Sequence, residues 1–316
     1  YWFLKNTIEI LREGIYTSIQ DLKRTGFRKY GVPKSGPMDE YSHILTNWLL
    51  DKEIISELLE ITYYGPKIKI NFDTKIALFG SECDVRLNNN KIVTGKSISV
   101  KSGDILDIKK CINGNRVYLG FSADMKLKNT FNSKSTYDKI QIGGLNGKKL
   151  LKNDKIEFIN LRDCKSKKIP SSFVRSNNQN VIIRIIKGIH YNRVNNFNNE
   201  SKINFKISPN SDRMGLRLIN YKIKLNDYSE IESTIVTKGS IQIPKDGNPI
   251  ILMSDSQSSG GYPIFGNICK VDISKLSQVQ PNQKIKFKFI SLNESNKLIE
   301  YEKKKFISKL NLDLSS

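Results

Sequence analysis

At 316 residues, with 38% hydrophobic content and a net charge of +21, the chain is long enough for about two domains, each with an apolar core. No apolar run reaches the ~18–20 residues that a membrane-spanning helix requires, and the first residues lack the charged-then-apolar pattern of a secretory signal. These features exclude a helical membrane protein, and we expect a soluble, cytoplasmic one.

The positive charge invites a comparison with nucleic-acid-binding proteins, but its make-up argues against specific recognition. Only 11 of the 52 basic residues are Arg, the side chain best suited to phosphate and base contacts. The lysines are spread along the chain instead of forming one stripe. We therefore expect a lysine-covered surface with no specific nucleic-acid partner, although weak electrostatic binding to DNA stays open.

The cysteines and histidines are too scattered for a structural metal site. None of the four cysteines forms a Cys-x-x-Cys pair and the two histidines are far apart, at positions Cys83, Cys111, Cys164, Cys269, His43 and His190. This distribution predicts reduced, mostly buried thiols and no metal site.

Residues 14–39, GIYTSIQDLKRTGFRKYGVPKSGPMD, combine turn residues, polar residues and apolar residues in one stretch. Gly and Pro permit tight turns and close backbone approach, and the interleaved apolar residues argue against disorder. Two interpretations stay open. The stretch is either an ordered, polar-lined loop system at a site or a set of tight turns between short strands.

A helix is predicted directly after this stretch. Asp39 is a suitable N-cap, and apolar residues from Tyr41 to Leu49 follow at helical spacing, which predicts an amphipathic helix over residues 39–50. His43 lies on this helix with no partner motif around it, so we expect a surface or hydrogen-bonded histidine, not a catalytic one. A second, short helix is predicted over residues 52–58.

Short strands without intervening helices predict a mainly β fold of antiparallel barrels or sandwiches. In the first half the predicted strands cover residues 6–10, 61–64, 67–72, 76–79, 85–87, 92–93, 97–100, 105–108, 117–121 and 156–161. In the second half they cover residues 181–186, 205–207, 215–218, 223–225, 240–243, 249–253 and 284–290.

Composition divides the chain into two β-rich halves. Residues 1–165 form the first predicted barrel, residues 166–180 a linker rich in Lys, Ser and Asn, and residues 181–292 the second barrel. Residues 293–316 are expected to form a lysine-rich C-terminal helix or tail. Both halves carry short strands followed by a polar loop with Gly, so we expect two similar barrels.

The candidate chemistry lies in these loops, because Asp can act as a general base and Arg can hold a carboxylate with two donors. Each such residue is also explained as a turn cap or a surface ion pair. No Ser–His–Asp motif is present. The candidate catalytic residues are Arg24, Asp39, Asp212 and Arg213, and the candidate substrate-binding residues are Gln20, Asp21, Ser35, Gly36, Met38, Ser211, Met214, Gln257, Gly260, Gly261 and Tyr262. They suit a small amide or carboxylated substrate.

Seven stretches, in order, carry a family resemblance. Residues 14–39 are followed by LLEITYYGP (58–66), NSKSTY (132–137), GGLNG (143–147), SPNSDRMGLRL (208–218), GSIQIPKDGNPIILMSD (239–255) and QSSGGYP (257–263). On these motifs the chain resembles the biotin-dependent carboxyltransferase A/B-subdomain family, and the resemblance covers about residues 6–290. That family includes the C component of bacterial 5-oxoprolinase, the KipA proteins and the second component of allophanate-hydrolase-type complexes.

The resemblance implies two cyclophilin-like β-barrel domains and a composite site formed with a KipI-like partner, the B component. In 5-oxoprolinase a third protein, the A component, completes an enzyme that opens 5-oxo-L-proline to L-glutamate at the expense of ATP, which this chain or a partner would bind. One alternative is a biotin-dependent urea or amide carboxyltransferase component; the chain has no Met-Lys-Met motif, so biotin would come from elsewhere. Another is a non-enzymatic KipA-type protein that binds a KipI-like kinase inhibitor.

Two further expectations follow from the resemblance. Arg24, Asp39, Arg213 and Gln257 should converge on one cleft between the halves. Lys23 stands where the family usually has Gly, so it places a charge and a Cβ where close backbone approach is expected.

Overall fold

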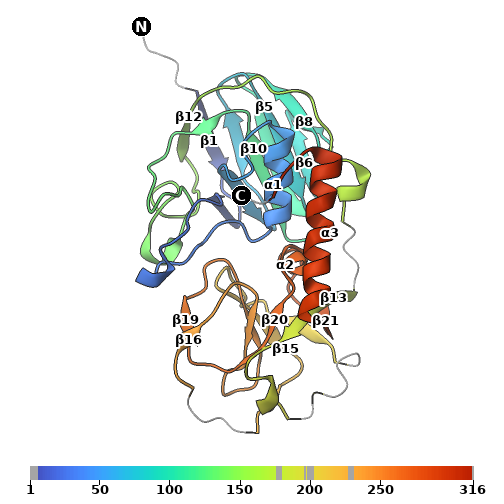
Figure 1. The fold of residues 1–316 in the computed structure, drawn as a ribbon. Coiled ribbons are helices and arrows are strands. Elements are labelled where there is room, and N and C mark those ends of the chain that lie inside the picture. Colours follow the sequence, from blue (N-terminus) through green and yellow to red (C-terminus); the bar gives the residue numbers. More distant parts are fainter. Residues whose placement is uncertain (1–5, 176–179, 196, 198–202, 227–230, 315–316) are drawn as a thin grey trace. The chain divides into compact units, whose positions relative to one another are not determined.

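The computed structural model describes residues 6–175, 180–195, 197, 203–226 and 231–314 and divides the chain into two compact units (Figure 1). The first unit runs from Tyr1 to Asn177 and the second from Asn178 to Ser316, so the boundary falls inside the predicted linker. Strands build both units, and the predicted mainly β fold is confirmed. No helix in the described part of the chain is both long and apolar enough to cross a membrane.

Two antiparallel sheets enclose the core of the first unit. The larger has the strand order β11-β12-β1-β4-β9-β6-β7, and the smaller has the order β2-β3-β10-β5-β8. The strands are β1 (Thr7–Arg12), β2 (Tyr16–Gln20), β3 (Leu58–Thr62), β4 (Lys67–Ile70), β5 (Thr74–Gly80), β6 (Cys83–Leu87), β7 (Asn90–Lys91), β8 (Ser97–Val100), β9 (Ile105–Cys111), β10 (Arg116–Phe121), β11 (Asp124–Met125) and β12 (Lys155–Ile159).

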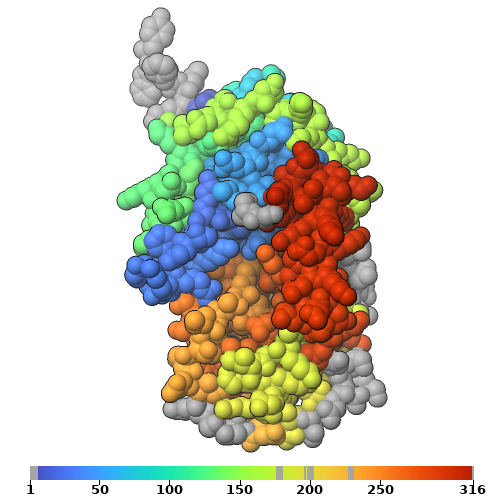
Figure 2. Space-filling model, in the orientation of Figure 1, coloured from blue at the N-terminus to red at the C-terminus, as the bar shows by residue number. Residues whose placement is uncertain are grey.

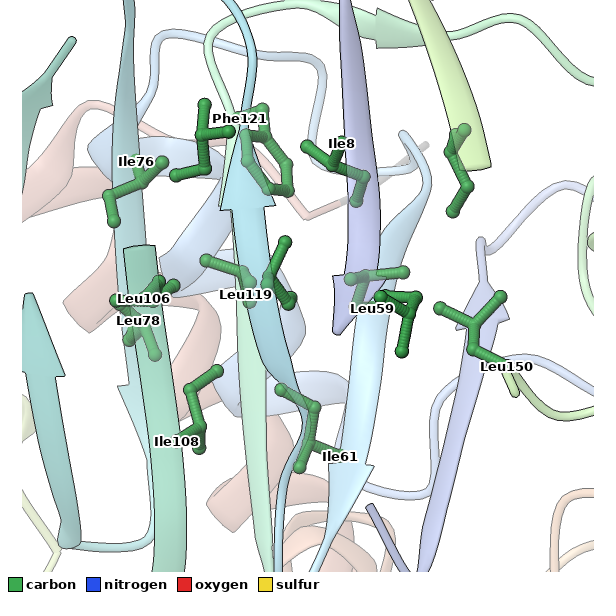
Figure 3. Close-up of a cluster of buried hydrophobic side chains, with 14 of the residues drawn as sticks. Ile8, Leu59, Ile61, Ile76, Leu78, Leu106, Ile108, Leu119, Phe121 and Leu150 are labelled. Carbon is green, nitrogen blue, oxygen red and sulfur yellow. The ribbon is translucent and has the colours of Figure 1, made fainter. Parts of the chain in front are cut away.

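Alternation of apolar and polar residues places the apolar side chains between the two sheets. In the larger sheet Ile8 of β1 is in register with Ile70 of β4, and in the smaller sheet Leu119 of β10 is in register with Leu59 of β3. All four are fully buried. Figure 3 shows side chains from both sheets gathered in one core. Packing in this core fixes the strands from which the candidate loops extend.

Helix α1 (Glu40–Leu49) confirms the helix predicted over residues 39–50. The Asp39 carboxylate accepts a hydrogen bond from the backbone N–H of Ser42, at 3.0 Å, which makes Asp39 the N-cap. The helix buries Leu45 and Leu49 and packs on β5 and β10.

The helix predicted over residues 52–58 is wrong. Ser56 closes a turn on Glu53, and β3 begins at Leu58. The Lys52 ammonium donates to the carbonyl of Ala123, at 2.8 Å, and the Glu57 carboxylate accepts from the N–H of Met125, at 2.7 Å. These buried bonds to the chain after β10 favour an irregular segment over a helical turn.

Two short predicted strands are also wrong. At residues 92–93 the structure has no strand, because β7 lies two residues earlier and pairs in a tight hairpin with β6. At residues 223–225 only Leu225 makes an isolated bridge, with Val194. Each segment has two apolar residues beside a turn, and burial of these side chains does not by itself create the hydrogen bonds of a strand pair.

The second unit is a closed barrel with the strand order β13-β20-β17-β18-β15-β14-β21. Parallel pairing of β13 with β21 joins the first and last strands of this barrel, whereas the other pairs are antiparallel. Strands β16 and β19 form a separate two-stranded ribbon. The strands are β13 (Asn180–Lys187), β14 (Phe205–Ile207), β15 (Gly215–Ile219), β16 (Thr234–Ile235), β17 (Ser240–Gln242), β18 (Ile250–Leu252), β19 (Ser259–Gly260), β20 (Ile264–Ile268) and β21 (Lys284–Phe289).

Two helices accompany the barrel. Helix α3 (Leu292–Leu310) confirms the predicted C-terminal helix and starts with a capping box formed by Ser291 and Glu294. Helix α2 (Lys270–Ser277) and strand β20 were not predicted. The Asp272 carboxylate of α2 binds the Arg184 guanidinium of β13 with two short contacts, 2.8 and 2.6 Å, and so fixes the helix on the barrel.

Part of the predicted linker packs on the first unit. Phe173, in the 3₁₀ helix η3 (Ser171–Phe173), is fully buried and its carbonyl accepts from the Tyr41 hydroxyl, at 2.9 Å. The Arg175 guanidinium lies 3.6 Å from the centre of the Tyr41 ring. All four cysteines are buried and free, as predicted.

Candidate functional site

In the first unit Asp21 joins the 14–39 loop system to a second loop more than a hundred residues away. Its carboxylate accepts hydrogen bonds from the hydroxyls of Ser133 and Ser135, at 2.5 and 2.8 Å, and from the N–H of Lys134, at 2.7 Å. Asp21 is 1% exposed. A buried carboxylate with several donors is a strong organising centre, so Asp21 positions the serine-rich turn.

Gln20 ties the same two loops together one residue earlier. Its Oε1 accepts from the N–H of Gly36, at 3.1 Å, and its Nε2 donates to the carbonyl of Thr136, at 3.2 Å. The side chain is fully buried. Both ends of one amide are therefore used to hold the backbone. Residues 14–39 are ordered and contain strand β2 followed by turns, and whether they form a site stays a prediction.

Glycines allow the two loops to touch. Gly143 has a φ of +68°, and a Cβ there would lie 2.0 Å from the carbonyl oxygen of Ser135. A Cβ at Gly36, with a φ of +83°, would lie 2.9 Å from the carbonyl oxygen of Asp21. Only Gly meets both demands, a left-handed backbone and close approach.

Gly143→Ala is expected to destabilise the first unit by roughly 3–5 kcal/mol, because a strained backbone is combined with a clash against backbone. Gly26 is the matched control. It also has a positive φ, +83°, but nothing lies within 4 Å of its Cβ position, so Gly26→Ala should cost only about 1–2 kcal/mol.

Urea unfolding followed by tryptophan fluorescence would measure this difference, since Trp48 lies in helix α1 of the first unit and the sequence has no tryptophan after residue 48. Equal losses in the two variants would contradict the close approach of the loops.

The candidate catalytic residues of this unit already have structural tasks. The Asp39 carboxylate caps α1 through one oxygen, and its other oxygen accepts from the Ser42 hydroxyl, at 2.7 Å. Arg24, 2% exposed, donates through Nη2 to the carbonyl of Ser135, at 2.5 Å. The catalytic roles of Asp39 and Arg24 stay predictions. The hydrogen bonds of these two side chains show that both also shape the loops.

A buried network behind these loops was missed in the sequence. The Glu60 carboxylate of β3 accepts from the N–H of Met38, at 2.7 Å, and from the Tyr118 hydroxyl, at 2.6 Å, and that hydroxyl also accepts from the N–H of Asp39, at 2.8 Å. Burial raises the pKa of Tyr118 well above its usual value, so the phenol stays protonated and can donate to Glu60. A Glu in the middle of an apolar strand was the available signal. Met38 is buried.

Ser35 lies at the turn before Gly36 and has a φ of 52°. Its side chain is 5% exposed, and its hydroxyl has no hydrogen-bond partner among the described residues. A non-Gly residue held in the left-handed region is uncommon and is often found at functional sites. Ser35 therefore stays a substrate-binding candidate.

His43 is fully buried in α1, and its Nε2 lies 3.2 Å from the carbonyl oxygen of Gln20, while Nδ1 has no partner among the described residues. Burial lowers the pKa of His43 below its ordinary value. The ring is neutral in the folded protein at neutral pH, and one of its two nitrogens makes a hydrogen bond. His43 is thus the hydrogen-bonded histidine of the two expected possibilities, and it is not at the surface.

The pKa of His43 predicts a pH dependence of stability. The unfolded chain binds a proton at His43 below pH ~6.5, whereas the folded protein does so only at lower pH. The unfolded state then holds more protons, so the free energy of unfolding should fall by up to about 1.4 kcal/mol per pH unit as the pH drops below ~6.5.

Urea unfolding by tryptophan fluorescence at pH 7.5 and pH 5.5 would check this, and His43→Gln should lose most of the dependence. His190→Gln is the control, because His190 lies in the second unit. Unchanged pH dependence in the His43 variant would contradict the assignment.

The tip of the 14–39 loop system faces solvent. Tyr30, in the 3₁₀ helix η1 (Arg28–Tyr30), is 69% exposed, and in the space-filling view this blue segment stands at the surface (Figure 2). The Lys23 ammonium lies 3.9 Å from a carboxylate oxygen of Glu53, in a solvent-exposed ion pair. The family usually has Gly at this position, and in this chain the Lys23 side chain is accommodated because it extends to the surface.

In the second unit a buried ion pair joins the two candidate loops. The Arg213 guanidinium donates through Nε and Nη2 to the two carboxylate oxygens of Asp255, at 2.7 and 3.2 Å, and the two side chains are 8% and 7% exposed. The Asp255 N–H also donates to the Arg213 carbonyl, at 2.9 Å. The sequence indicated Arg213 as a candidate but not its pairing with Asp255.

The neighbouring candidates fix the turn before β15. The exposed Asp212 carboxylate accepts from the N–H groups of Met214 and Gly215, at 2.8 and 3.1 Å. The Ser211 hydroxyl accepts from the N–H of Arg217, at 3.0 Å. These hydrogen bonds stabilise the turn, and they fix the backbone before and after Arg213.

The remaining candidates, Gln257, Gly260, Gly261 and Tyr262, lie on or beside the ribbon of β16 and β19, and Tyr262 is 45% exposed. A Cβ at Gly260 would lie 2.6 Å from Nε2 of Gln242. Gln242, 1% exposed in β17, is a polar residue that the sequence analysis missed.

The structure brings the candidates together in two groups. Arg24 and Asp39 belong to the first unit, and Arg213 and Gln257 belong to the second. Their convergence on one cleft stays a prediction.

Two observations bear on where a magnesium–nucleotide complex could bind. The described residues contain no group of three or more His, Cys, Asp or Glu side chains that could hold a metal ion. The N-terminus of α1, the natural place for a phosphate near these loops, is occupied by the Asp39 carboxylate. An anion there would meet a negative charge.

A family model for the carboxyltransferase domain, subdomain A and B, matches residues 30–289. The chain belongs to this carboxyltransferase A/B family. The family resemblance found in the sequence is thereby confirmed.

Members of the carboxyltransferase A/B family occur as separate proteins and as parts of longer enzymes. The C component of the Escherichia coli 5-oxoprolinase is 30% identical over 302 residues, which are 95% of this chain and 96% of that protein. The urea amidolyase of Saccharomyces cerevisiae is 31% identical over 322 residues, 95% of this chain but 17% of that protein.

The crystal structure of the Kluyveromyces lactis urea amidolyase shares the fold with a TM-score of 0.92 at 29% identity, covering 98% of this chain and 20% of that chain. This chain therefore spans about a fifth of the length of the urea amidolyases. The mainly β fold, with two sheets in the first unit and a closed barrel in the second, is thus found in this carboxyltransferase family.

Proposed function

We propose that this chain is the C component of an ATP-dependent 5-oxoprolinase, which converts 5-oxo-L-proline, ATP and water to L-glutamate, ADP and phosphate. In this proposal it acts in the cytoplasm as a hydrolase component and is active only with a KipI-like B component and a third protein, the A component. The observation that carries the proposal is the match over nearly the full length of the C component of a 5-oxoprolinase.

The polar loops support a small, carboxylated amide as the substrate. Arg213 and Arg24 are the candidate groups for the substrate carboxylate, because a guanidinium holds a carboxylate with two donors. The Ser35 hydroxyl, which lacks a partner among the described residues, is a candidate for the amide. A lactam is a poor electrophile and its hydrolysis needs activation by ATP.

Because the Asp39 carboxylate already occupies the N-terminus of α1, we assign ATP to a partner protein of the complex. This chain then binds and orients the substrate and keeps it apart from bulk water. That division of labour explains why the proposed activity requires the complex.

A second candidate is a component of a biotin-dependent urea or amide carboxyltransferase. The observation that favours it is the fold and sequence similarity to the urea amidolyase of K. lactis across almost the whole chain. Both candidates handle a small amide, so the substrate distinguishes them.

The test is a substrate comparison with the chain co-expressed and co-purified with its A and B components. With ATP, the complex should release glutamate from 5-oxo-L-proline and should not consume urea in the presence of a biotin carboxylase and its carrier. Turnover of urea alone would establish the second candidate. A tight complex without turnover of either substrate would overturn both and leave a KipA-type binding protein.

A further inference from the structure

Two cysteines of the first unit lie side by side within the core. Cys83 of β6 and Cys111 of β9 are partners in the antiparallel register, and their Sγ atoms are 3.0 Å apart. The residues are 5% and 0% exposed. Neither has a task in the proposed function, and the other two cysteines have no such neighbour among the described residues.

The backbone around this pair suits a covalent link. The N–H of Ile112 donates to the carbonyl of Glu82, at 2.7 Å, which marks Cys83 and Cys111 as a non-hydrogen-bonded pair of the ladder. Cα atoms in such pairs are ~4.5 Å apart, and disulfides span Cα separations of ~4.4–6.8 Å. The sulfurs need to approach by only about 1 Å, to the ~2.05 Å of a disulfide bond.

We propose that Cys83 and Cys111 are an oxidation site, which a two-electron oxidant such as hydrogen peroxide converts to a disulfide between β6 and β9 that thiols reverse. The inference is independent of the substrate of the protein, because it concerns a strand pair of the first unit.

The proposed step balances as two thiols and one peroxide giving one disulfide and two waters. A thiolate sulfur of Cys111 attacks one peroxide oxygen, the O–O bond breaks, and the leaving hydroxide takes up a proton as water. Cys83 then attacks the sulfur of the sulfenic acid, the S–S bond forms, the S–O bond breaks, and the second water leaves.

The order of the two sulfurs follows from their contact. The contact between the two sulfurs lowers the pKa of Cys111 and raises the pKa of Cys83, because a thiolate at Cys111 can accept a hydrogen bond from a protonated Cys83. The positive charge of Arg116 acts on Cys111 in the same direction. Cys111 is therefore the sulfur that is oxidised first.

The test uses the purified full chain, treated with hydrogen peroxide, denatured and alkylated with N-ethylmaleimide. Two of the four thiols should be protected, and proteolysis should yield a peptide pair linked through Cys83 and Cys111 that dithiothreitol separates. Because the link joins residues 28 positions apart, the thermal midpoint of the oxidised first unit should rise by roughly 5–10 °C.

Cys164→Ser is the matched control and should form the same link, whereas Cys83→Ser should retain all of its remaining thiols or show oxidation of Cys111 alone. Four reactive thiols after oxidation of the wild-type chain would overturn the proposal, as would a link that involves Cys164 or Cys269. The wild-type measurement decides the matter even where a variant folds poorly.

Discussion

Asp21→Ala is expected to lower the free energy of unfolding of the first unit by about 4 kcal/mol, because it removes a buried acceptor and leaves its donors unpaired. Those donors are the two serine hydroxyls and one backbone N–H of the turn at residues 133–135, together with the backbone N–H of Lys23, at 3.3 Å. Tryptophan fluorescence during urea unfolding measures the loss in this unit alone.

Asp21→Asn separates charge from shape. An amide can accept only through its oxygen, so its NH₂ group would face the N–H of Lys134, and we expect about half of the loss. Asp138→Ala is the control within the same loop, since among the described residues the Asp138 side chain accepts only a weak bond, from the Tyr16 hydroxyl at 3.3 Å. A loss of more than about 1 kcal/mol there, or none in Asp21→Ala, would contradict the central position of Asp21.

Arg213→Ala is expected to cost the second unit roughly 3–5 kcal/mol, because it leaves the Asp255 carboxylate buried without its partner. Hydrogen–deuterium exchange of the amides in β15 and β18 measures the loss, and the tryptophan-detected midpoint of the first unit should not move. Lys303→Ala is the control, because it breaks the exposed ion pair with Glu300 in α3 and should cost under about 1 kcal/mol.

The double variant Arg213→Met with Asp255→Leu separates the structural role of Arg213 from binding. Apolar side chains of similar volume should restore most of the stability. Under the proposed function the complex should nevertheless be at least about tenfold less active, because a carboxylate clamp is missing. Full activity of this double variant would exclude a direct role for Arg213.

Local features of the fold could be predicted from the sequence. The start of α1 could be predicted because its N-cap, Asp39, and its apolar spacing lie within a few residues of each other. Strands β8 and β14 have the predicted bounds because their patterns are also local. The helix predicted over residues 52–58 failed because Lys52 and Glu57 bind backbone near residue 124, which no local pattern contains.

The candidate site could be predicted only as a set of loops. The sequence indicated Asp21 and the motifs at residues 132–137 and 143–147 separately, but the sheets decide that they meet. In the same way the pairing of Arg213 with Asp255, 42 residues apart, depends on the register of β15 with β18. Glu60 and Tyr118 were missed because each stands inside an apolar strand, where only the structure reveals the buried hydrogen bond between them.

The most direct test of the proposed function is an omission assay. The A and B components without this chain should release glutamate from 5-oxo-L-proline and ATP at less than about one-hundredth of the rate of the full complex. Addition of the wild-type chain should restore the rate, and addition of the Arg213→Met, Asp255→Leu variant should not. Full glutamate release in the absence of this chain would contradict the proposed function.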